Sequence, residues 1–431
     1  MATRPATVSF PVLERPIPVA SRAVERPLPG ASPVVERPVA VAPPVIERAT
    51  SEGEVSIYLP SPSFVPRPDA EYYVRRAIQR HRAGDWEGAW EDDSKAIGLN
   101  PNLPLPFGNR GILKVFRKDY KGALADFDEA IRLEPRFADA YRNRGYARDR
   151  LGDLDGALDD LTMAVQINPR DGEAWRHRGT ILHRKGDLEG ALADYTRAVE
   201  VDPTDHTSWS GRGGIHRAQK DLPAALADFA RALEADPNDV YALSLRGHTY
   251  SDLGNFEGAA ADFSRALERD PDAPKLLFDR GCARYNLHRW RECIPDFRAA
   301  GAKDPTLRDE SQIRVFLARA RVGEMKEARA QLTYYLIHPM KDTRPWQRES
   351  LRFAVALLSE SEYLQRIPSS LGKLDAGNAC EAYFHAGTIR ILKGDGSGAR
   401  DLFERALQTG ADACEEYASA RAELAALKSG H

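Results

Sequence analysis

Two glycine-rich stretches come closest, within this chain, to a site for chemistry. They are Gly211-Arg212-Gly213-Gly214 and Gly394-Asp395-Gly396-Ser397-Gly398. A phosphate-binding loop follows a strand and ends in Lys-Ser or Lys-Thr, and neither stretch follows an expected strand or supplies that pair. The ten histidines show no HExxH or other metal-ligand spacing. We therefore expect no catalytic residue, no cofactor site and no metal site, and a protein that is not an enzyme.

The four cysteines do not suggest chemistry either. Their separations fit neither a CxxC metal knuckle nor a dense disulfide framework. The four are Cys282, Cys293, Cys380 and Cys414. Free thiols are typical of reducing compartments, so we expect a cytoplasmic protein.

Charge and hydropathy exclude two classes of partner. The 61 lysines and arginines are balanced by 64 acidic residues, giving a net charge of −3. Proteins that bind nucleic acid usually carry a basic excess, because neutralising phosphates supplies much of their affinity. No apolar run approaches the roughly 18 residues of a membrane span, and the N-terminus shows no secretory signal. We expect no nucleic-acid partner and no membrane span.

A period of thirty-four residues runs through most of the chain. Prolines, glycines, alanines and large apolar residues each form a column at this spacing. The columns are Pro101, Pro135, Pro169, Pro203, Pro237, Pro271 and Pro305; Gly111, Gly145, Gly179, Gly213, Gly247 and Gly281; Ala89, Ala123, Ala157, Ala191, Ala225 and Ala259; and Phe127, Leu161, Tyr195, Phe229, Phe263 and Phe297. Such a fixed period is the signature of a repeat architecture.

These columns resemble the tetratricopeptide-repeat (TPR) family. That family places Gly at repeat position 8, Ala at 20, an aromatic residue at 24 and Pro at 32. The resemblance implies an all-α superhelical solenoid of antiparallel helix pairs, with seven repeats in residues 69–307. Small residues at positions 8 and 20 let the two helices of a pair approach closely, while pairs such as Gly152-Asp153 and Gly186-Asp187 end one helix and begin the next.

Position 7 of every repeat departs from the family pattern, where Leu is common. It is arginine throughout, and position 23 is aspartate throughout. The arginines are Arg76, Arg110, Arg144, Arg178, Arg212, Arg246 and Arg280, and the aspartates are Asp92, Asp126, Asp160, Asp194, Asp228, Asp262 and Asp296. We expect these columns to face each other as a ladder of ion pairs that specifies helix packing.

Two further segments flank the array. Residues 1–68 are rich in proline and repeat a Glu-Arg phrase, followed by Pro in the first three copies, with Glu14, Glu25, Glu36 and Glu47 eleven residues apart. Such a composition favours a disordered tail, which serves either as a spacer or as tandem copies of a short linear ligand. Residues 308–431 are expected to contain degenerate helical repeats, a further TPR-like unit and a capping helix over 412–428. The block from Trp346 through residues 380–410 to residues 416–424 is also similar to the ending of bacterial NlpI-type TPR adaptors.

In the TPR family, positions 2, 5, 9, 12 and 13 of the first helix line a concave groove that binds peptides. Those positions, by resemblance, predict a groove that is basic in the middle and apolar towards its ends; the alternative is that they are ordinary solvated helix residues. The predicted groove residues are Ile112, Phe116, Arg142, Tyr146, Arg150, Arg176, His183, Arg184, Arg217, Tyr241, Phe278 and Tyr285. An extended or helical segment of another protein, with acidic residues, would suit such a groove.

We therefore predict a protein–protein interaction scaffold or adaptor. It would hold one partner in the groove, and the Pro-rich tail would tether a second partner or occupy the groove itself. The alternative is a self-assembling structural protein, built by head-to-tail solenoid contacts or by tails that dock in neighbouring grooves. The sequence names no partner, because a repeat fold is a platform that does not fix its function.

Overall fold

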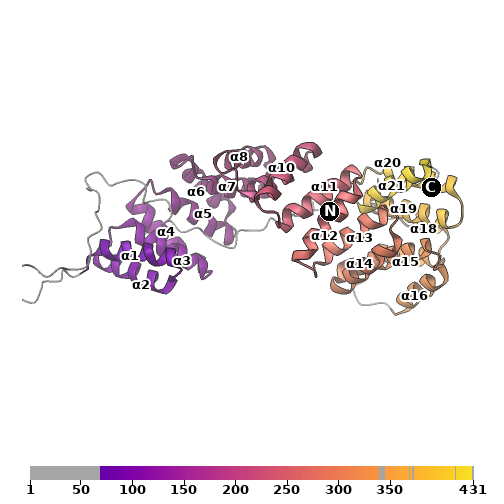
Figure 1. Cartoon of the computed structure of the whole chain (residues 1–431), viewed down its shortest axis with the longest axis horizontal. Coiled ribbons are helices and arrows are strands. Elements are labelled where there is room, and N and C mark those ends of the chain that lie inside the picture. Colours follow the sequence, from indigo (N-terminus) through magenta and orange to yellow (C-terminus); the bar gives the residue numbers. More distant parts are fainter. Residues whose placement is uncertain (1–67, 339–344, 368, 371–372, 413, 430–431) are drawn as a thin grey trace, which may run out of the picture. The chain divides into compact units, whose positions relative to one another are not determined.

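The chain is built from α-helices that follow one another as antiparallel pairs (Figure 1). The computed structural model describes residues 68–338, 345–367, 369–370, 373–412 and 414–429. The predicted all-α solenoid of helix pairs is thereby confirmed for the described part of the chain. Residues 1–67 of the predicted tail lie outside the described residues. One short antiparallel sheet, which the sequence did not indicate, pairs β1 (Ser369–Ser370) with β2 (Lys373–Leu374).

Two compact units make up the chain, divided between Val201 and Asp202. The described part of unit one contains α1 (Ala70–Ala83), α2 (Trp86–Leu99), α3 (Pro104–Phe116), α4 (Tyr120–Leu133), α5 (Ala138–Arg150), α6 (Leu154–Ile167), α7 (Gly172–Lys185) and α8 (Leu188–Val201). The described part of unit two contains α9 (His206–Ala218), α10 (Leu222–Ala235), α11 (Val240–Leu253), α12 (Phe256–Arg269), α13 (Pro274–Asn286), α14 (Trp290–Lys303), the 3₁₀ helix η2 (Pro305–Leu307), α15 (Arg308–Arg321), α16 (Met325–Ile337), α17 (Pro345–Ala354), α18 (Glu360–Gln365), α19 (Ala376–Leu392), α20 (Gly396–Gln408) and α21 (Glu415–Ser429).

Close packing of the two helices in each pair explains the glycine column. A Cβ atom added to Gly111 of α3 would lie 2.6 Å from Cε1 of Phe127 in α4, closer than carbon atoms can approach. The same clash, at 2.7 Å, would occur between Gly247 and Phe263. Glycine at position 8 and the large residue at position 24 are therefore one feature, which sets the distance between the helices.

The predicted ion-pair ladder is confirmed. In each repeat the arginine Nε and Nη2 donate to the two carboxylate oxygens of the aspartate sixteen residues later, at distances from 2.6 to 3.0 Å. The aspartate side chains are at most 6% exposed. A buried two-bond pair of this kind fixes the rotation of one helix against the other.

Turns between the helices of a pair follow the expected chemistry. Gly152 and Gly186 adopt left-handed conformations, with φ of 86° and 85°, that end the first helix. The next residues, Asp153 and Asp187, then accept hydrogen bonds from the backbone N–H groups of Gly156 and Gly190 at 3.0 and 2.9 Å. These bonds begin the second helix by satisfying N–H groups that lack partners within it.

Beyond η2 the helix pairs lose the strict period. The left-handed residue that ends the first helix of a pair moves from His288 in the seventh repeat to Gly323 after α15, an interval of thirty-five residues instead of thirty-four. Farther on, Glu381 of α19 accepts hydrogen bonds from Trp346 Nε1 at 3.0 Å and from Ser350 Oγ at 2.9 Å, which holds α17 against α19. The glycine–ring contact returns in the last pair, between Gly387 and Phe403.

The packing of Gly111 leads to a paired prediction. The substitution Gly111→Ala should lower the free energy of unfolding by about 1–3 kcal/mol, because the added methyl forces Phe127 out of place. Gly98, within α2, has no neighbouring atom within 4 Å of an added Cβ, so Gly98→Ala should instead raise the free energy of unfolding by about 0.5–1 kcal/mol. Urea denaturation of the full chain measures both, and equal effects would contradict the packing argument.

Candidate functional site

The candidate site is the surface formed by the first helix of each pair, which we call the first-helix face. In unit one it comprises α1, α3, α5 and α7, and in unit two α9, α11, α13 and α15. All predicted groove residues lie on these helices. In unit one they are Ile112 and Phe116 on α3, Arg142, Tyr146 and Arg150 on α5, and Arg176, His183 and Arg184 on α7; in unit two they are Arg217 on α9, Tyr241 on α11, and Phe278 and Tyr285 on α13. That they form one groove stays a prediction.

Arg142 in unit one is a buried, fully engaged cation. Its Nη1 lies 2.5 Å from Asp171, 3.1 Å from Asp139 and 3.8 Å from Glu173. Burial opposes the charged form, but these three carboxylates outweigh it and raise the pKa of Arg142. Asp171 also begins α7, since it accepts a hydrogen bond from the N–H of Ala174. Arg142 therefore holds α5 against the next first helix.

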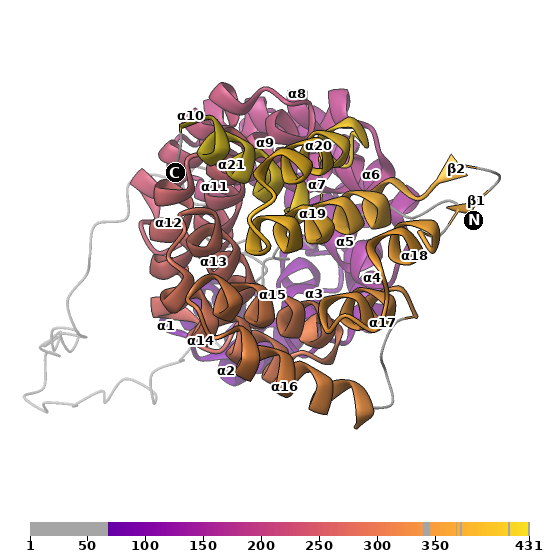
Figure 2. The same ribbon diagram turned by 90° about the vertical axis from the view of Figure 1, so that its right-hand side faces the viewer.

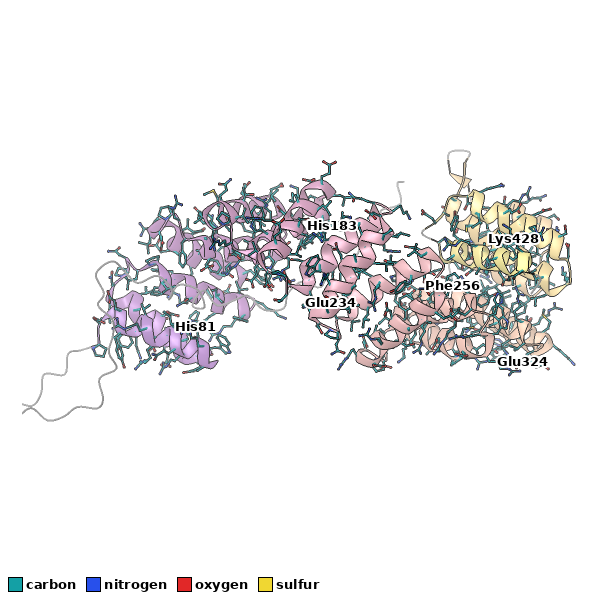
Figure 3. The ribbon with its side chains drawn as sticks, turned by 45° about the horizontal axis from the view of Figure 1, so that its top comes forward. His81, His183, Glu234, Phe256, Glu324 and Lys428 are labelled. Atoms are coloured by element: carbon teal, nitrogen blue, oxygen red, sulfur yellow. The ribbon has the colours of Figure 1, made fainter. Side chains whose placement is uncertain are left out.

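The more exposed cations of this face also have partners. Arg184 forms an ion pair with Asp149 of α5, and the guanidinium of Arg150 lies 5.8 Å from the centre of the Tyr120 ring. His183 lies in the last turn of α7 and is labelled in Figure 3. Burial lowers its pKa. Arg184 is thus matched by a carboxylate and Arg150 by a ring, so a partner would have to exchange these contacts for its own.

At the apolar end of the unit-one face, the predicted groove residues are partly or fully buried in the hydrophobic core. Ile112 is 1% exposed and belongs to the cluster around Phe127. Phe116 is half-buried, and its ring centre lies 5.3 Å from that of Trp86, which is 41% exposed. Trp86 and Phe116 together form the accessible aromatic surface at this end.

Ion pairs also join neighbouring first helices in unit two. Arg217 Nε of α9 donates to Asp252 of α11 at 2.8 Å, and His248 of α11 lies 2.9 Å from Asp279 of α13. His206, at the start of α9, lies 2.8 Å from Asp239, the residue that caps α11. In each of these contacts the basic side chain comes from the earlier first helix and the carboxylate from the next one.

The last helix of the chain, α21, lies on the unit-two face. It packs on α19, α20 and α13 (Figures 1 and 2). Glu416 accepts a hydrogen bond from Arg314 at 2.6 Å, and Glu423 accepts one from Arg321 at 2.6 Å, both from α15. The face of unit two therefore already holds a helix, bound by its carboxylates.

Two predicted groove residues are covered in this arrangement. Phe278 and Tyr285 of α13 are each 1% exposed and belong to the core cluster that includes Phe384 of α19. The guanidinium of Arg314 lies between rings, 5.4 Å from the centre of Tyr285 and 5.1 Å from that of Phe384. These rings contact residues of the same chain, so a foreign segment reaches them only by replacing the C-terminal helices.

Sequence reasoning missed Arg314, although one signal for it exists. Arg314 follows the last ladder arginine, Arg280, by the thirty-four-residue period, but the position that would supply its aspartate is Ala330. It also stands nine residues before the left-handed Gly323, whereas each ladder arginine stands eight before the corresponding turn residue. One residue is about 100° of rotation in an α-helix, so the slip turns Arg314 away from its second helix and towards α21.

Among the described residues, no group of three or more His, Cys, Asp or Glu side chains is placed to hold a metal ion. Nor is any helix within the described ranges long and apolar enough to cross a membrane. In each glycine-rich stretch a glycine has a structural role. Gly213 packs against Phe229, and Gly398 donates its backbone N–H to Asp395 at the start of α20.

Comparison with known proteins recognises tetratricopeptide repeats. Models of the tetratricopeptide repeat match residues 213–276 and, in a second version, residues 109–172, 164–206 and 178–240. A search of curated proteins found no match. The comparisons do not confirm the predicted NlpI-type similarity of the C-terminal third.

Many solved structures are similar to parts of the chain. One is YrrB, described as a TPR protein with an unusual peptide-binding site, at 28% identity over 43% of this chain and 95% of that chain, with a TM-score of 0.38. Another is PilF of Pseudomonas aeruginosa, at 13% identity over 47% and 93% of the two chains, with a TM-score of 0.44. A tetratricopeptide repeat protein from Parabacteroides merdae gives 19% identity over 58% and 98%, with a TM-score of 0.42.

The pair between His206 and Asp239 predicts a pH dependence. The hydrogen bond that the protonated His206 ring donates to the Asp239 carboxylate raises the pKa of His206 above its ordinary 6.5. Because the folded state binds this proton more tightly than the unfolded state, the stabilisation is fully present below the ordinary pKa and is lost as pH rises through the raised value. His206→Gln should therefore cost more stability at about pH 5.5 than at about pH 8.5. Thermal unfolding at both pH values measures this, and an equal cost at both would contradict it.

Proposed function

We propose that the chain is an adaptor that holds segments of other proteins on its first-helix faces. TPR proteins are generally protein-interaction scaffolds, and such repeats are recognised over residues 109–276. The adaptor role and the face that performs it are our proposal. It follows the general rule that a repeat array offers an extended surface on one side of its stacked helices.

A single observation carries this proposal. The unit-two face binds a helix, α21, through carboxylates that meet arginines of a first helix. A face that holds one acidic helix in this way has the side chains needed to hold another. We extend this mode to unit one, where the exposed Arg150 and Arg184 would meet the acidic residues of a partner.

Three finer predictions belong to this proposal. The partner is an extended or helical segment with acidic residues, as suits a surface that carries arginines. The chain's own Glu-Arg-Pro repeats, which lie outside the described residues, are a candidate partner. A cytoplasmic location stays a prediction based on the cysteines, which form no disulfide with one another.

The test compares charge reversal on two sides of unit one. Partners are captured with the full chain, identified, and measured individually by fluorescence anisotropy. The double variant Arg150→Glu/Arg184→Glu changes exposed positions of the first-helix face. It should weaken a true partner by about tenfold or more, since each lost charge-assisted hydrogen bond costs roughly 1.5–3 kcal/mol.

The matched control reverses two arginines on second helices. Arg132 of α4 and Arg197 of α8 are exposed and pair with glutamates three residues away, so Arg132→Glu/Arg197→Glu makes the same change in net charge. This control should leave affinity unchanged. Equal losses in both variants would point to non-specific electrostatics, and no loss in either would exclude this face as the binding surface.

A further inference from the structure

The contacts of α21 resemble those of a bound ligand more than those of a simple end cap. Glu416 and Glu423 are seven residues apart, two helical turns, and so lie on the same side of α21. Each meets one arginine of α15 at 2.6 Å. A third carboxylate, Glu415, lies 3.9 Å from Lys275 of α13. The carboxylates of α21 thus contact cations from two first helices, α13 and α15.

Two further contacts fix the direction of α21 on the face. Arg421 donates from Nη2 to the backbone oxygens of Ser251 at 3.0 Å and Asp252 at 2.8 Å, at the C-terminal end of α11. Carbonyl groups at a helix C-terminus lack partners within the helix and attract cations. Before the helix begins, Asp412 pairs with Lys220 at 2.8 Å. A helix bound in the reverse direction would lose these contacts.

The contacts of α21 combine apolar and ionic side chains, since Ala420 and Leu424 belong to the unit-two core cluster and Tyr417 and Leu427 pack against it. The buried residues of α21 are Glu416, Ser419, Ala420, Glu423 and Leu424. By contrast, the buried residues of α13 include Leu276, Leu277, Phe278 and Tyr285. Buried ion pairs roughly break even, because the attraction must first repay the removal of both charges from water. The ion pairs of α21 therefore specify its position more than they stabilise it.

The face also has hydrogen-bonding groups that α21 does not use. Among the described residues, Arg314 Nε, Arg321 Nε and Tyr285 Oη are buried without a hydrogen-bond partner. All three lie around the same site, since Arg314 stacks near Tyr285, and Tyr285 and Arg321 both contact the ring of Trp290. A ligand with more or better-placed acceptor atoms would make contacts that α21 leaves unmade.

From these observations we infer that the first-helix face of unit two is a recognition site for acidic amphipathic helices, and that α21 is its resident occupant, which a partner's acidic helix displaces. The inference rests on the proposed function and names the partner's chemistry. The partner is a helix with carboxylates at positions i and i+7, small residues at i+3 and i+4, and a leucine at i+8. In the free chain, α21 supplies this pattern itself and closes the face.

The experiment opens the face in the full chain and offers the helix back as a peptide. Glu416→Gln with Glu423→Gln removes both ion pairs to α15 while keeping the length and shape of the side chains. A fluorescent peptide of residues 411–431, with Cys414→Ser to prevent oxidation, is the probe. The opened chain should bind this peptide at least tenfold more tightly than the wild-type chain does, because its own helix competes less well. A peptide that carries the same two glutamines should bind the opened chain at least tenfold more weakly.

The control changes charge without touching the face. Asp401 and Glu404 are exposed on the neighbouring helix α20, so Asp401→Asn/Glu404→Gln makes the same change in net charge. This chain should bind the peptide as the wild type does. The inference is overturned if the opened chain, with an unchanged circular dichroism spectrum, binds the peptide no better than the control chain.

A second variant covers the case in which the opened chain does not fold. Arg421→Gln keeps both carboxylate pairs and removes only the bonds to the carbonyl oxygens of α11. It should also raise peptide affinity above that of the wild type, and a folded Arg421→Gln chain with wild-type affinity would count against the inference. These outcomes are independent of the charge reversals in unit one, so failure here and failure of the proposed function can be told apart.

Discussion

The close approach of the two helices in each repeat is the constraint on which the rest of the structure depends. Glycine at one position lets an aromatic or leucine side chain from the second helix lie directly against the first, as Gly247 and Phe263 show. A two-bond Arg–Asp pair beside this contact fixes the rotation of the helices. Together they decide which side of every first helix faces away from its partner, and that side becomes the candidate binding surface.

A shift of one residue in this constraint changes the role of an arginine. Up to Arg280 the arginine column is paired inside each repeat, so its charges are used for packing. At α15 one extra residue precedes Gly323, and Ala330 stands where the other repeats have the aspartate. Arg314 therefore has no ladder aspartate with which to pair inside its own repeat. Arg314 is fully buried all the same, and its guanidinium bonds Glu416 and Ser419 of α21. Departure from the repeat pattern thus marks the place where α21 lies on the face.

Much of the fold could be predicted from the sequence, because it rests on contacts at a fixed spacing. The glycine–ring contacts, the turn glycines and the whole Arg–Asp ladder follow from columns that repeat every thirty-four residues. The position of α21 could not be predicted this way, because it depends on contacts about one hundred residues apart, such as Arg314 with Glu416. From sequence, that helix is expected only as an end cap, and nothing there indicates that it buries Glu416 and Glu423, as the structure does.

The candidate site was predicted less completely than the fold. The family pattern places every predicted residue on a first helix, which the structure bears out, but it does not show which arginines are already paired. Arg142 is buried because the residue that begins the next first helix, Asp171, reaches back to it. Such pairing depends on how neighbouring repeats stack, and a column of residue types does not report it. The sequence therefore predicts where a partner would bind better than which side chains are free to hold it.

Amide hydrogen exchange of the wild-type chain tests the central claim most directly, because it measures how easily each helix opens. If α21 is a resident ligand, its amides should exchange much faster than those of α13 and α20, and added peptide of residues 411–431 should speed them further. The amides of α13 should stay protected throughout. If α21 instead exchanges as slowly as α13 and responds to no peptide, it is an integral part of the fold, and the account of an occupied recognition face is wrong.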